Sequence, residues 1–317
     1  MNKNKQISYI RMMLQYLALL FFSLFSTNVL AQDFELIKIQ SAYYPKQSVE
    51  ESTTEGEVGF FEWNGQLAIP QTFKKSKKTI LLHKLGYTNL RVDTEGNTTI
   101  DFVENTKHYH FISYNLGLIQ ILNQKWKLIS NLNPILASDF GERLNEDDLL
   151  FQASAMALYT KNINTQYGFG LIYTTRLGRP LILPMGMYKY RTLKMKVDIV
   201  LPNKLSIMFN TNNRTFHYGF EARLNGGLFN NTNDISTVNA IIDEVGYSRL
   251  NIGPAIAVKL KKTMKLHLSG GMAVGRTLEF IDINEETFDR TPESGPFFRA
   301  GLSFVPKKKK KEEPSNK

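Results

Sequence analysis

The sequence predicts an all-β protein: a single antiparallel transmembrane β-barrel of 12 or 14 strands, preceded by a cleaved signal peptide. Three observations lead to this prediction. Segments of alternating apolar and polar residues recur along the chain, an export signal precedes them, and very short turns are mixed with long polar loops. This combination is typical of barrels that cross an outer membrane.

The segment 192–201 shows the alternation most clearly. Leu193, Met195, Val197, Ile199 and Leu201 share one face of an extended strand, and the charged residues between them share the other. A helix would scatter these residues because its period is 3.6. About ten alternating residues are also enough for one tilted strand to cross a bilayer. Taken alone, the segment fits a half-buried strand of a soluble sandwich equally well.

The N-terminus has the three parts of a secretory signal peptide. Residues 2–11 are polar and basic, residues 12–25 are apolar, and small side chains precede a cleavage site between Ala31 and Gln32. The alternative is an uncleaved anchor. No later stretch approaches 18 consecutive apolar residues, so we expect no transmembrane helix in the mature chain. Such an exported chain is either soluble in the periplasm, secreted, or a barrel.

Composition excludes several classes of function. The chain has no cysteine, which rules out disulfides, thiolate metal sites and a lipid-modified N-terminal cysteine. Of the net charge of +10, the signal peptide carries +3 and residues 307–317 carry +4, which leaves +3 for the body. No basic face remains, so we expect no nucleic-acid partner.

The predicted strands follow one another with turn residues between them. Residues 91–107 and 230–244 are polar and predict loops. The dipeptide Asn64-Gly65 is a strong hairpin signal, but a continuous strand with a bulge at Gly65 fits slightly better. Counting the weak segment 181–188 gives 14 strands, and dropping weak segments gives 12. The segments are 34–44, 58–69, 79–89, 108–118, 126–137, 151–159, 166–174, 181–188, 192–201, 205–209, 216–224, 250–258, 264–274 and 298–304.

The connections alternate in length. Turns near Asn123, Ile163 and Lys261 are tight, whereas loops near Glu142, Asn233 and Glu286 are long and polar. Outer-membrane barrels pair short periplasmic turns with longer extracellular loops, and both of their termini are periplasmic. The predicted division is therefore 1–31 signal peptide, 32–305 barrel, and 306–317 disordered lysine-rich periplasmic tail.

The last strand resembles the C-terminal β-signal that the barrel-assembly machinery reads: Phe298, Ala300, Leu302 and Phe304 alternate and end in an aromatic residue. That signal normally ends the protein, whereas Pro306 to Lys317 follow here. A second resemblance rests on Tyr109, Lys125–Leu128, Pro134, Ser138–Phe140, Asp148-Leu149, Gly168–Tyr173 and Leu183–Gly186. In these residues the chain resembles outer-membrane β-barrels of Bacteroidota grouped as a domain of unknown function. The resemblance implies an outer-membrane location in a Gram-negative bacterium, with lipids and the assembly machinery as partners; oligomeric state stays open.

Charged residues opposite the apolar rows are expected to face the lumen, because a charge on the lipid face near mid-membrane costs roughly 2–4 kcal/mol. They either form a paired network that plugs the barrel or line a path for a small solute with basic selectivity. The residues are Lys194, Lys196, Asp198, His217, Glu221, Arg223, Lys259, Lys265, His267 and Arg299.

Signals for catalysis are weak. His217, His267 and Ser269 are the candidates for a lipid hydrolase on well-formed inward rows, and no nucleophile motif surrounds them. His108 and His110 have the spacing of a two-ligand metal clip but no third ligand nearby. We therefore expect a barrel without catalytic chemistry or cofactor, structural or a narrow solute channel. The alternatives are an outer-membrane lipid-modifying enzyme and a soluble secreted β protein.

Overall fold

The computed structural model describes residues 35–49, 56–73, 76, 78–96, 106–141, 143–212, 215–236, 241–261 and 263–306. The predicted signal peptide, its cleavage site at Ala31 and Gln32, and residues 307–317 lie outside this part. No helix of the described residues is long and apolar enough to span a membrane. The strands are β1 (Ile37–Ser48), β2 (Gly56–Thr72), β3 (Thr79–Gly96), β4 (Thr106–Ile121), β5 (Trp126–Ser138), β6 (Leu149–Thr160), β7 (Thr165–Thr174), β8 (Leu181–Arg191), β9 (Met195–Leu201), β10 (Lys204–Asn210), β11 (Phe216–Ser236), β12 (Ile241–Lys261), β13 (Met264–Asp282), β14 (Thr287–Asp289) and β15 (Gly295–Phe304).

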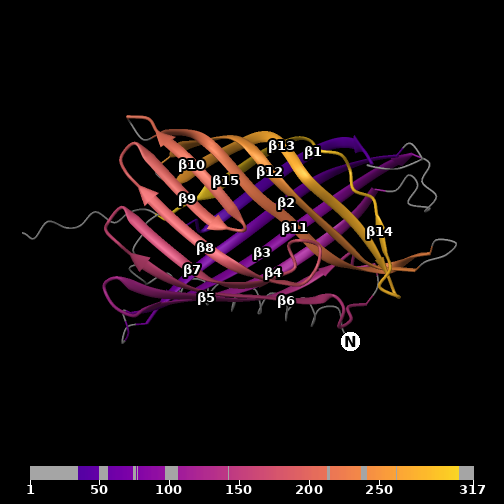
Figure 1. Ribbon diagram of the computed structural model, residues 1–317, viewed down its shortest axis with the longest axis horizontal. Helices are drawn as coiled ribbons and strands as arrows, with labels where there is room; N and C mark the ends of the chain where they lie inside the picture. Colours follow the sequence, from indigo (N-terminus) through magenta and orange to yellow (C-terminus); the bar gives the residue numbers. More distant parts are fainter. Residues whose placement is uncertain are drawn as a thin grey trace, which may run out of the picture.

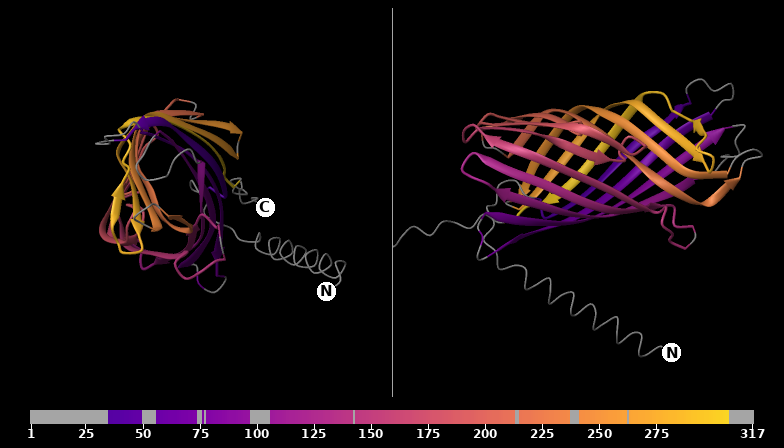
Figure 2. Two further views of the ribbon diagram at one scale, coloured as in Figure 1. Left: turned by 90° about the vertical axis from the view of Figure 1, so that its right-hand side faces the viewer. Right: turned by 60° about the horizontal axis from the view of Figure 1, so that its bottom comes forward.

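The strands close into a 14-strand antiparallel barrel (Figures 1 and 2). Each strand from β1 to β13 pairs with the next, and β15 pairs with both β13 and β1. The short β14 pairs only with the end of β13 and lies outside the ring. The prediction of an all-β barrel is confirmed, with the larger of the two strand numbers.

The two ends of the barrel differ in their connections. At the turn end, on the left of Figure 1, tight turns join β4 to β5, β6 to β7 and β8 to β9. At the loop end, on the right, longer segments join β5 to β6 and β13 to β15. The alternation of short and long connections in the sequence predicts this arrangement, because successive hairpin connections of an up-and-down barrel fall at alternate ends.

The outer surface carries the apolar rows. In β15, Phe297, Arg299 and Ser303 are buried, whereas Phe298 between them is 62% exposed. Near the turn end, outward aromatic rings pair across strands, with ring centroids 5.1 Å apart for Trp126 and Tyr159. Such rings are typical of the aromatic girdle at a membrane interface.

The segment around Asn64-Gly65 is a regular strand. Gly65 pairs with Ile39 on β1 and Tyr87 on β3, and the register shows no shift there. The preference for a continuous strand is confirmed, but the bulge is wrong. A Cβ atom on Gly65 would lie 3.2 Å from the Trp63 ring, so the tryptophan side chain lies over the glycine.

Strand β9 is shorter than predicted, with seven residues. Residues 192–194 form the turn from β8, where Met195 N donates to Thr192 Oγ1 at 3.0 Å and Thr192 N donates to Met195 O at 2.8 Å. The prediction of a ten-residue strand over 192–201 is therefore wrong at its start. Leu193 is 69% exposed in this turn.

The predicted loop over residues 230–244 is mostly strand. Strands β11 and β12 have 21 residues each and extend the hairpin beyond the short β9–β10 pair. Residue Asn230 of β11 also pairs with Ser138 of β5 on the far side of the ring. Its side chain donates to Asp148 Oδ1 at 2.9 Å. The prediction of a loop was wrong because Asn230, although polar, contacts strand β5 and the β5–β6 loop.

The contact between β11 and β5 pinches the loop-end half of the barrel. Strand β10 pairs with β11 only as far as Arg223, so the rest of β11 has no β10 partner and bends across the lumen. Strands β1–β5 then face β11–β13 and β15 across a packed interior. Its aromatic residues, which we call the aromatic plug, are all buried: Tyr44, Phe60, Tyr109, Phe229, Tyr247 and Phe297.

Candidate functional site in the barrel lumen

A polar chamber of about 240 Å³ lies in the lumen against the aromatic plug. Its lining comes from β1–β4, β11, β12, β15 and the loop after β7. Four cationic side chains face it, Lys38, Arg176, Arg223 and Arg299. Glu62 is the one carboxylate that lines it within the described residues. Arg223 is paired with Glu221, but the other cations still outnumber the lining carboxylate, and such an excess creates a positive potential that attracts anions.

Glu62 is already engaged by a buried arginine. Arg249 on β12 places Nη2 at 2.6 Å from Glu62 Oε2, and its side chain is 1% exposed. The guanidinium also lies over the Tyr44 ring, 3.8 Å from the centroid. A buried charge needs such partners because its desolvation is costly. This ion pair therefore joins the aromatic plug to the chamber, and it leaves the chamber cations without that carboxylate.

Replacing Glu62 by glutamine should destabilise the barrel. The change leaves the Arg249 charge buried without a counter-charge, which typically costs about 3–5 kcal/mol. The free energy of unfolding, measured by urea titration of the folded barrel, is expected to fall by this amount. The matched control is Glu95→Gln, which breaks the exposed ion pair with Lys46 and should leave the titration unchanged. Equal midpoints for the two variants would contradict a structural role for the buried pair.

Arg299 is the most enclosed cation of the chamber. It is 4% exposed, and its Nε has no hydrogen-bond partner among the described residues. With the Asn225 amide turned to satisfy its neighbours, the amide oxygen accepts a hydrogen bond from Arg299 Nη2 at 3.2 Å. A neutral amide leaves the charge uncompensated. An anion in the chamber would supply both the charge and the acceptor.

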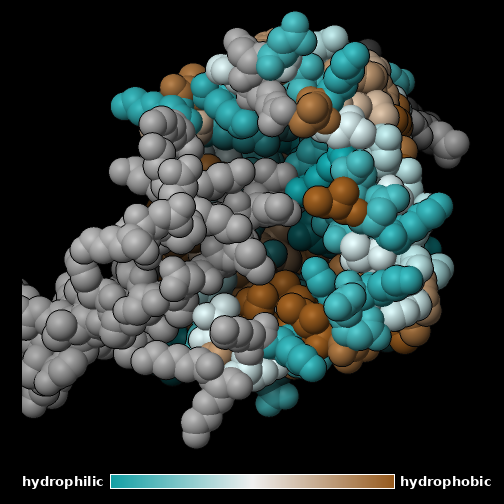
Figure 3. Space-filling view, turned by 90° about the vertical axis from the view of Figure 1, so that its left-hand side faces the viewer, coloured by the Kyte–Doolittle hydropathy of each residue, from teal (hydrophilic) through white to brown (hydrophobic). Residues whose placement is uncertain are grey.

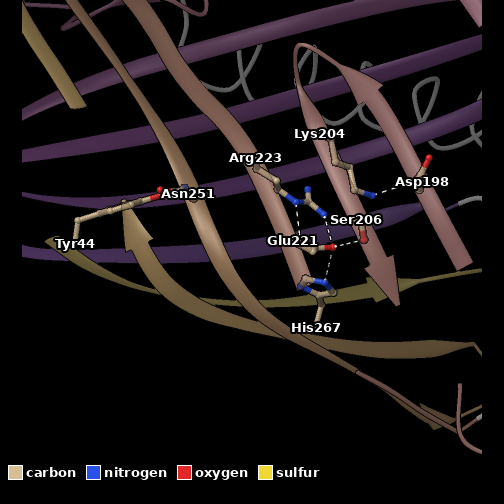
Figure 4. Close-up of polar contacts among 8 residues, drawn as sticks. All are labelled: Tyr44, Asp198, Lys204, Ser206, Glu221, Arg223, Asn251 and His267. Carbon is tan, nitrogen blue, oxygen red and sulfur yellow. Dashed lines mark hydrogen bonds and ion pairs between the residues drawn. The ribbon is translucent and has the colours of Figure 1, made fainter. Parts of the chain in front are cut away.

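A second polar cluster surrounds Glu221 on β11 (Figure 4). Ser206 Oγ on β10 donates to Glu221 Oε1 at 3.2 Å, and Arg223 Nε donates to Oε2 at 3.1 Å. His267 Nε2 on β13 lies 3.3 Å from Oε1. The carboxylate can meet a side chain two strands away because the intervening inward position on β12 is Gly253, which pairs with Glu221 and has no side chain.

The other predicted lumen charges divide into three groups. Asp198 accepts from Lys204 Nζ at 3.1 Å, and His217 Nδ1 lies 2.6 Å from Asn210 Oδ1. Lys196 and Lys265 are half-buried. Lys194 and Lys259 are exposed at the turn end, Lys194 in the β8–β9 turn and Lys259 beside the β12–β13 turn. Arg223 and Arg299 line the chamber, and the remaining charges of this prediction lie outside its lining.

Sequence reasoning missed Lys38, Glu62, Arg176 and Arg249. For Glu62 a signal was present: Phe61 and Trp63 are apolar neighbours, and alternation would have placed Glu62 with Asn64 on the inner face. Arg249 lay just before the predicted start of its strand at residue 250. Arg176 lies in a loop, where no periodic pattern exists.

The candidate catalytic groups do not assemble. His267 contacts Glu221, and Ser269 Oγ is buried without a hydrogen-bond partner in the described structure. His108 Nδ1 lies 3.3 Å from Asn89 Oδ1, and His110 Nδ1 lies 2.8 Å from Tyr87 Oη. Among the described residues, no cluster of three or more His, Cys, Asp and Glu side chains could hold a metal ion.

A family model described as "Domain of unknown function (DUF6268)" matches residues 27–305. The chain belongs to this family. The search of curated proteins found no match to this chain.

Several solved structures are similar to this DUF6268 protein. The NanC porin shares 8% identity, with 84% of this chain and 98% of that chain covered and a TM-score of 0.36. The translocator domain of the autotransporter NalP from Neisseria meningitidis shares 13% identity, with 95% and 97% covered and a TM-score of 0.34. LpxR from Salmonella typhimurium shares 7% identity, with 85% and 99% covered and a TM-score of 0.31. At these identities no ligand or reaction carries over to this chain.

Proposed function

We propose that this DUF6268 protein is an outer-membrane barrel that binds a small anionic solute in its lumen and is closed at its loop end. The location is supported by the outward apolar rows, by the aromatic rings near the turn end, and by the division between tight turns and long loops. The turn end then faces the periplasm and the loop end faces the exterior.

The observation that carries the ligand class is the charge of the chamber. Lys38, Arg176 and Arg299 line it together with Arg223, which is paired with Glu221, and Glu62 is held by Arg249. Arginine guanidinium groups suit carboxylate and phosphate groups because their donors form a planar fork. The aromatic plug favours a binding chamber over an open pore, because closely packed side chains leave no continuous path for water and ions.

A lipid-modifying enzyme is the weaker candidate. Such an enzyme needs a nucleophile or activated water beside an oriented base. His267 is the histidine that faces Glu221 in the described lumen, and no hydroxyl donates to its ring. The geometry of the described residues therefore favours binding over catalysis.

The proposal is tested with barrel purified from the outer-membrane fraction of a Gram-negative host and titrated calorimetrically in non-ionic detergent. Pyrophosphate and citrate should bind, whereas glucose should not. Arg299→Gln is expected to weaken pyrophosphate binding about 10- to 100-fold, the effect of one charge-assisted hydrogen bond of about 1.5–3 kcal/mol. Lys259→Gln, an exposed lysine outside the chamber lining, is the matched control. Absence from the outer-membrane fraction, or equal binding by both variants, would contradict the proposal.

A further inference from the structure

The lumen has an apolar side as well as a basic one. Strands β5–β9 carry an inward cluster that we call the methionine wall: Ile129, Met156, Leu158, Met185, Met187 and Val200. Cross-strand pairing continues around this wall, from Ile129 to Met156 and from Met187 to Val200. Over Gly168 of β7, a Cβ atom would lie 2.5 Å from Leu158 Cδ2 and 2.8 Å from Met156 Sδ, so these side chains fold over the inner face of β7.

The methionine wall lies across the ring from the basic chamber. In the strand order, β7 is opposite β15 and β1, which carry Arg299 and Lys38. Figure 3 looks onto the turn end, where a hollow has hydrophilic side chains above and beside it and a hydrophobic patch below it. An apolar wall inside a membrane barrel is unexpected for a water-filled lumen, whose lining is normally polar.

Size separates the two parts of this lumen. The chamber of about 240 Å³ is smaller than usual pockets for drug-sized ligands, about 300–1,000 Å³, so it takes a head group and little more. Methionine suits a wall that contacts a flexible hydrocarbon chain, because its unbranched side chain adapts to different shapes. A ligand matching both sides has one anionic head and one hydrocarbon chain.

We infer that the lumen binds a single-chain anionic amphiphile, with its carboxylate or phosphate head in the basic chamber and its hydrocarbon chain along the methionine wall. The inference rests on the proposed anion site and names its ligand class. The ligand enters from the turn end, since the aromatic plug closes the other. Its head contacts Arg299 and Lys38, and its chain contacts Met185 and Val200, which are partly buried members of the wall.

The test is a chain-length series on the full barrel in non-ionic detergent, with butanoate, hexanoate and octanoate as probes. Affinity should rise about fourfold for each added methylene, the effect of burying one CH₂ group of about 0.8 kcal/mol. Octyl phosphate compared with inorganic phosphate provides the second arm. The arm with the tighter binding shows whether the head group of the ligand is a carboxylate or a phosphate. Chain-dependent binding in either arm supports the inference.

The variant Met185→Gln separates the two sites, because Met185 is a partly buried methionine of the wall. It should weaken octanoate binding about tenfold or more, because it replaces an apolar contact by an amide, while butanoate binding changes little. Met272→Gln makes the same change on the outer surface, where Met272 is exposed, and should leave both affinities unchanged. An affinity independent of chain length, but still sensitive to Arg299→Gln, would overturn this inference and leave the anion site standing. Absence of binding by all probes would overturn both.

Discussion

Replacing Phe229 and Tyr247 together by alanine is expected to convert a barrel without steady conductance into one that conducts ions. The two rings stack with centroids 5.9 Å apart, and Phe229 also lies 5.3 Å from Tyr109 on the opposite side of the lumen. Their removal leaves a void between β11 and β4, beside the contact between β11 and β5. Water can then connect the chamber with the loop end.

The measurement is single-channel recording in planar bilayers. The unchanged protein should give a flat baseline, and the double variant should give discrete conductance steps. Each aromatic-to-alanine change in a core also costs about 3–5 kcal/mol, so both proteins are first checked for folding by their migration on a gel with and without heating. Tyr218→Ala with Phe220→Ala is the matched control, because both rings are exposed on the outer surface of the same strand. Conductance steps in the unchanged protein would contradict a lumen that is blocked at the loop end.

Replacing Gly226 by alanine is expected to prevent stable closure of the loop-end half. A Cβ atom there would lie 2.1 Å from Arg176 O and 2.5 Å from Tyr247 O, and both are backbone atoms that cannot rotate away. The β7–β8 loop approaches β11 at this point. Forcing in a methyl group typically costs about 1–3 kcal/mol and shifts the backbone.

The matched control is Gly186→Ala on β8, where a Cβ atom would meet nothing within 4 Å. We expect this variant to fold fully. Gly226→Ala should lower the urea midpoint and increase protease cleavage within residues 175–180, since that loop loses its seat on β11. An unchanged midpoint with an uncut loop would show that the close approach carries no stability.

The outward apolar rows could be predicted from sequence because they follow from a period of two, and the strand order because short connections join neighbouring strands. Phe298, Leu302 and Phe304 lie on one face in any extended chain, whatever its partners. Predictions were wrong where the local composition indicated one structure and contacts with distant residues imposed another. Residues 230–236 look like a loop by composition, but pairing with β12 and the contact with Ser138 hold them in a strand.

Part of the aromatic plug could not be predicted because Tyr44, Phe60 and Phe297 each stand beside a second aromatic residue. Tyr43-Tyr44 and Phe60-Phe61 each put one ring outside and one inside, and alternation does not show that the inner ring is buried. The methionine wall has the same origin, since β8 is apolar at successive positions from Leu181 to Met185. From sequence alone, such apolar runs are expected to face the lipid.

The sequence by itself determined that this chain forms a closed antiparallel barrel, because alternation, turn residues and loop lengths act within one hairpin at a time. Only the tertiary structure decided what the lumen contains. The short β9–β10 hairpin lets β11 cross to β5, and this crossing fills one half with aromatic rings while it brings Arg176, Arg223 and Arg299 to one chamber. These residues come from a loop and two strands that are far apart in the sequence. Their meeting depends on the closure of the whole ring, which no local sequence pattern can indicate.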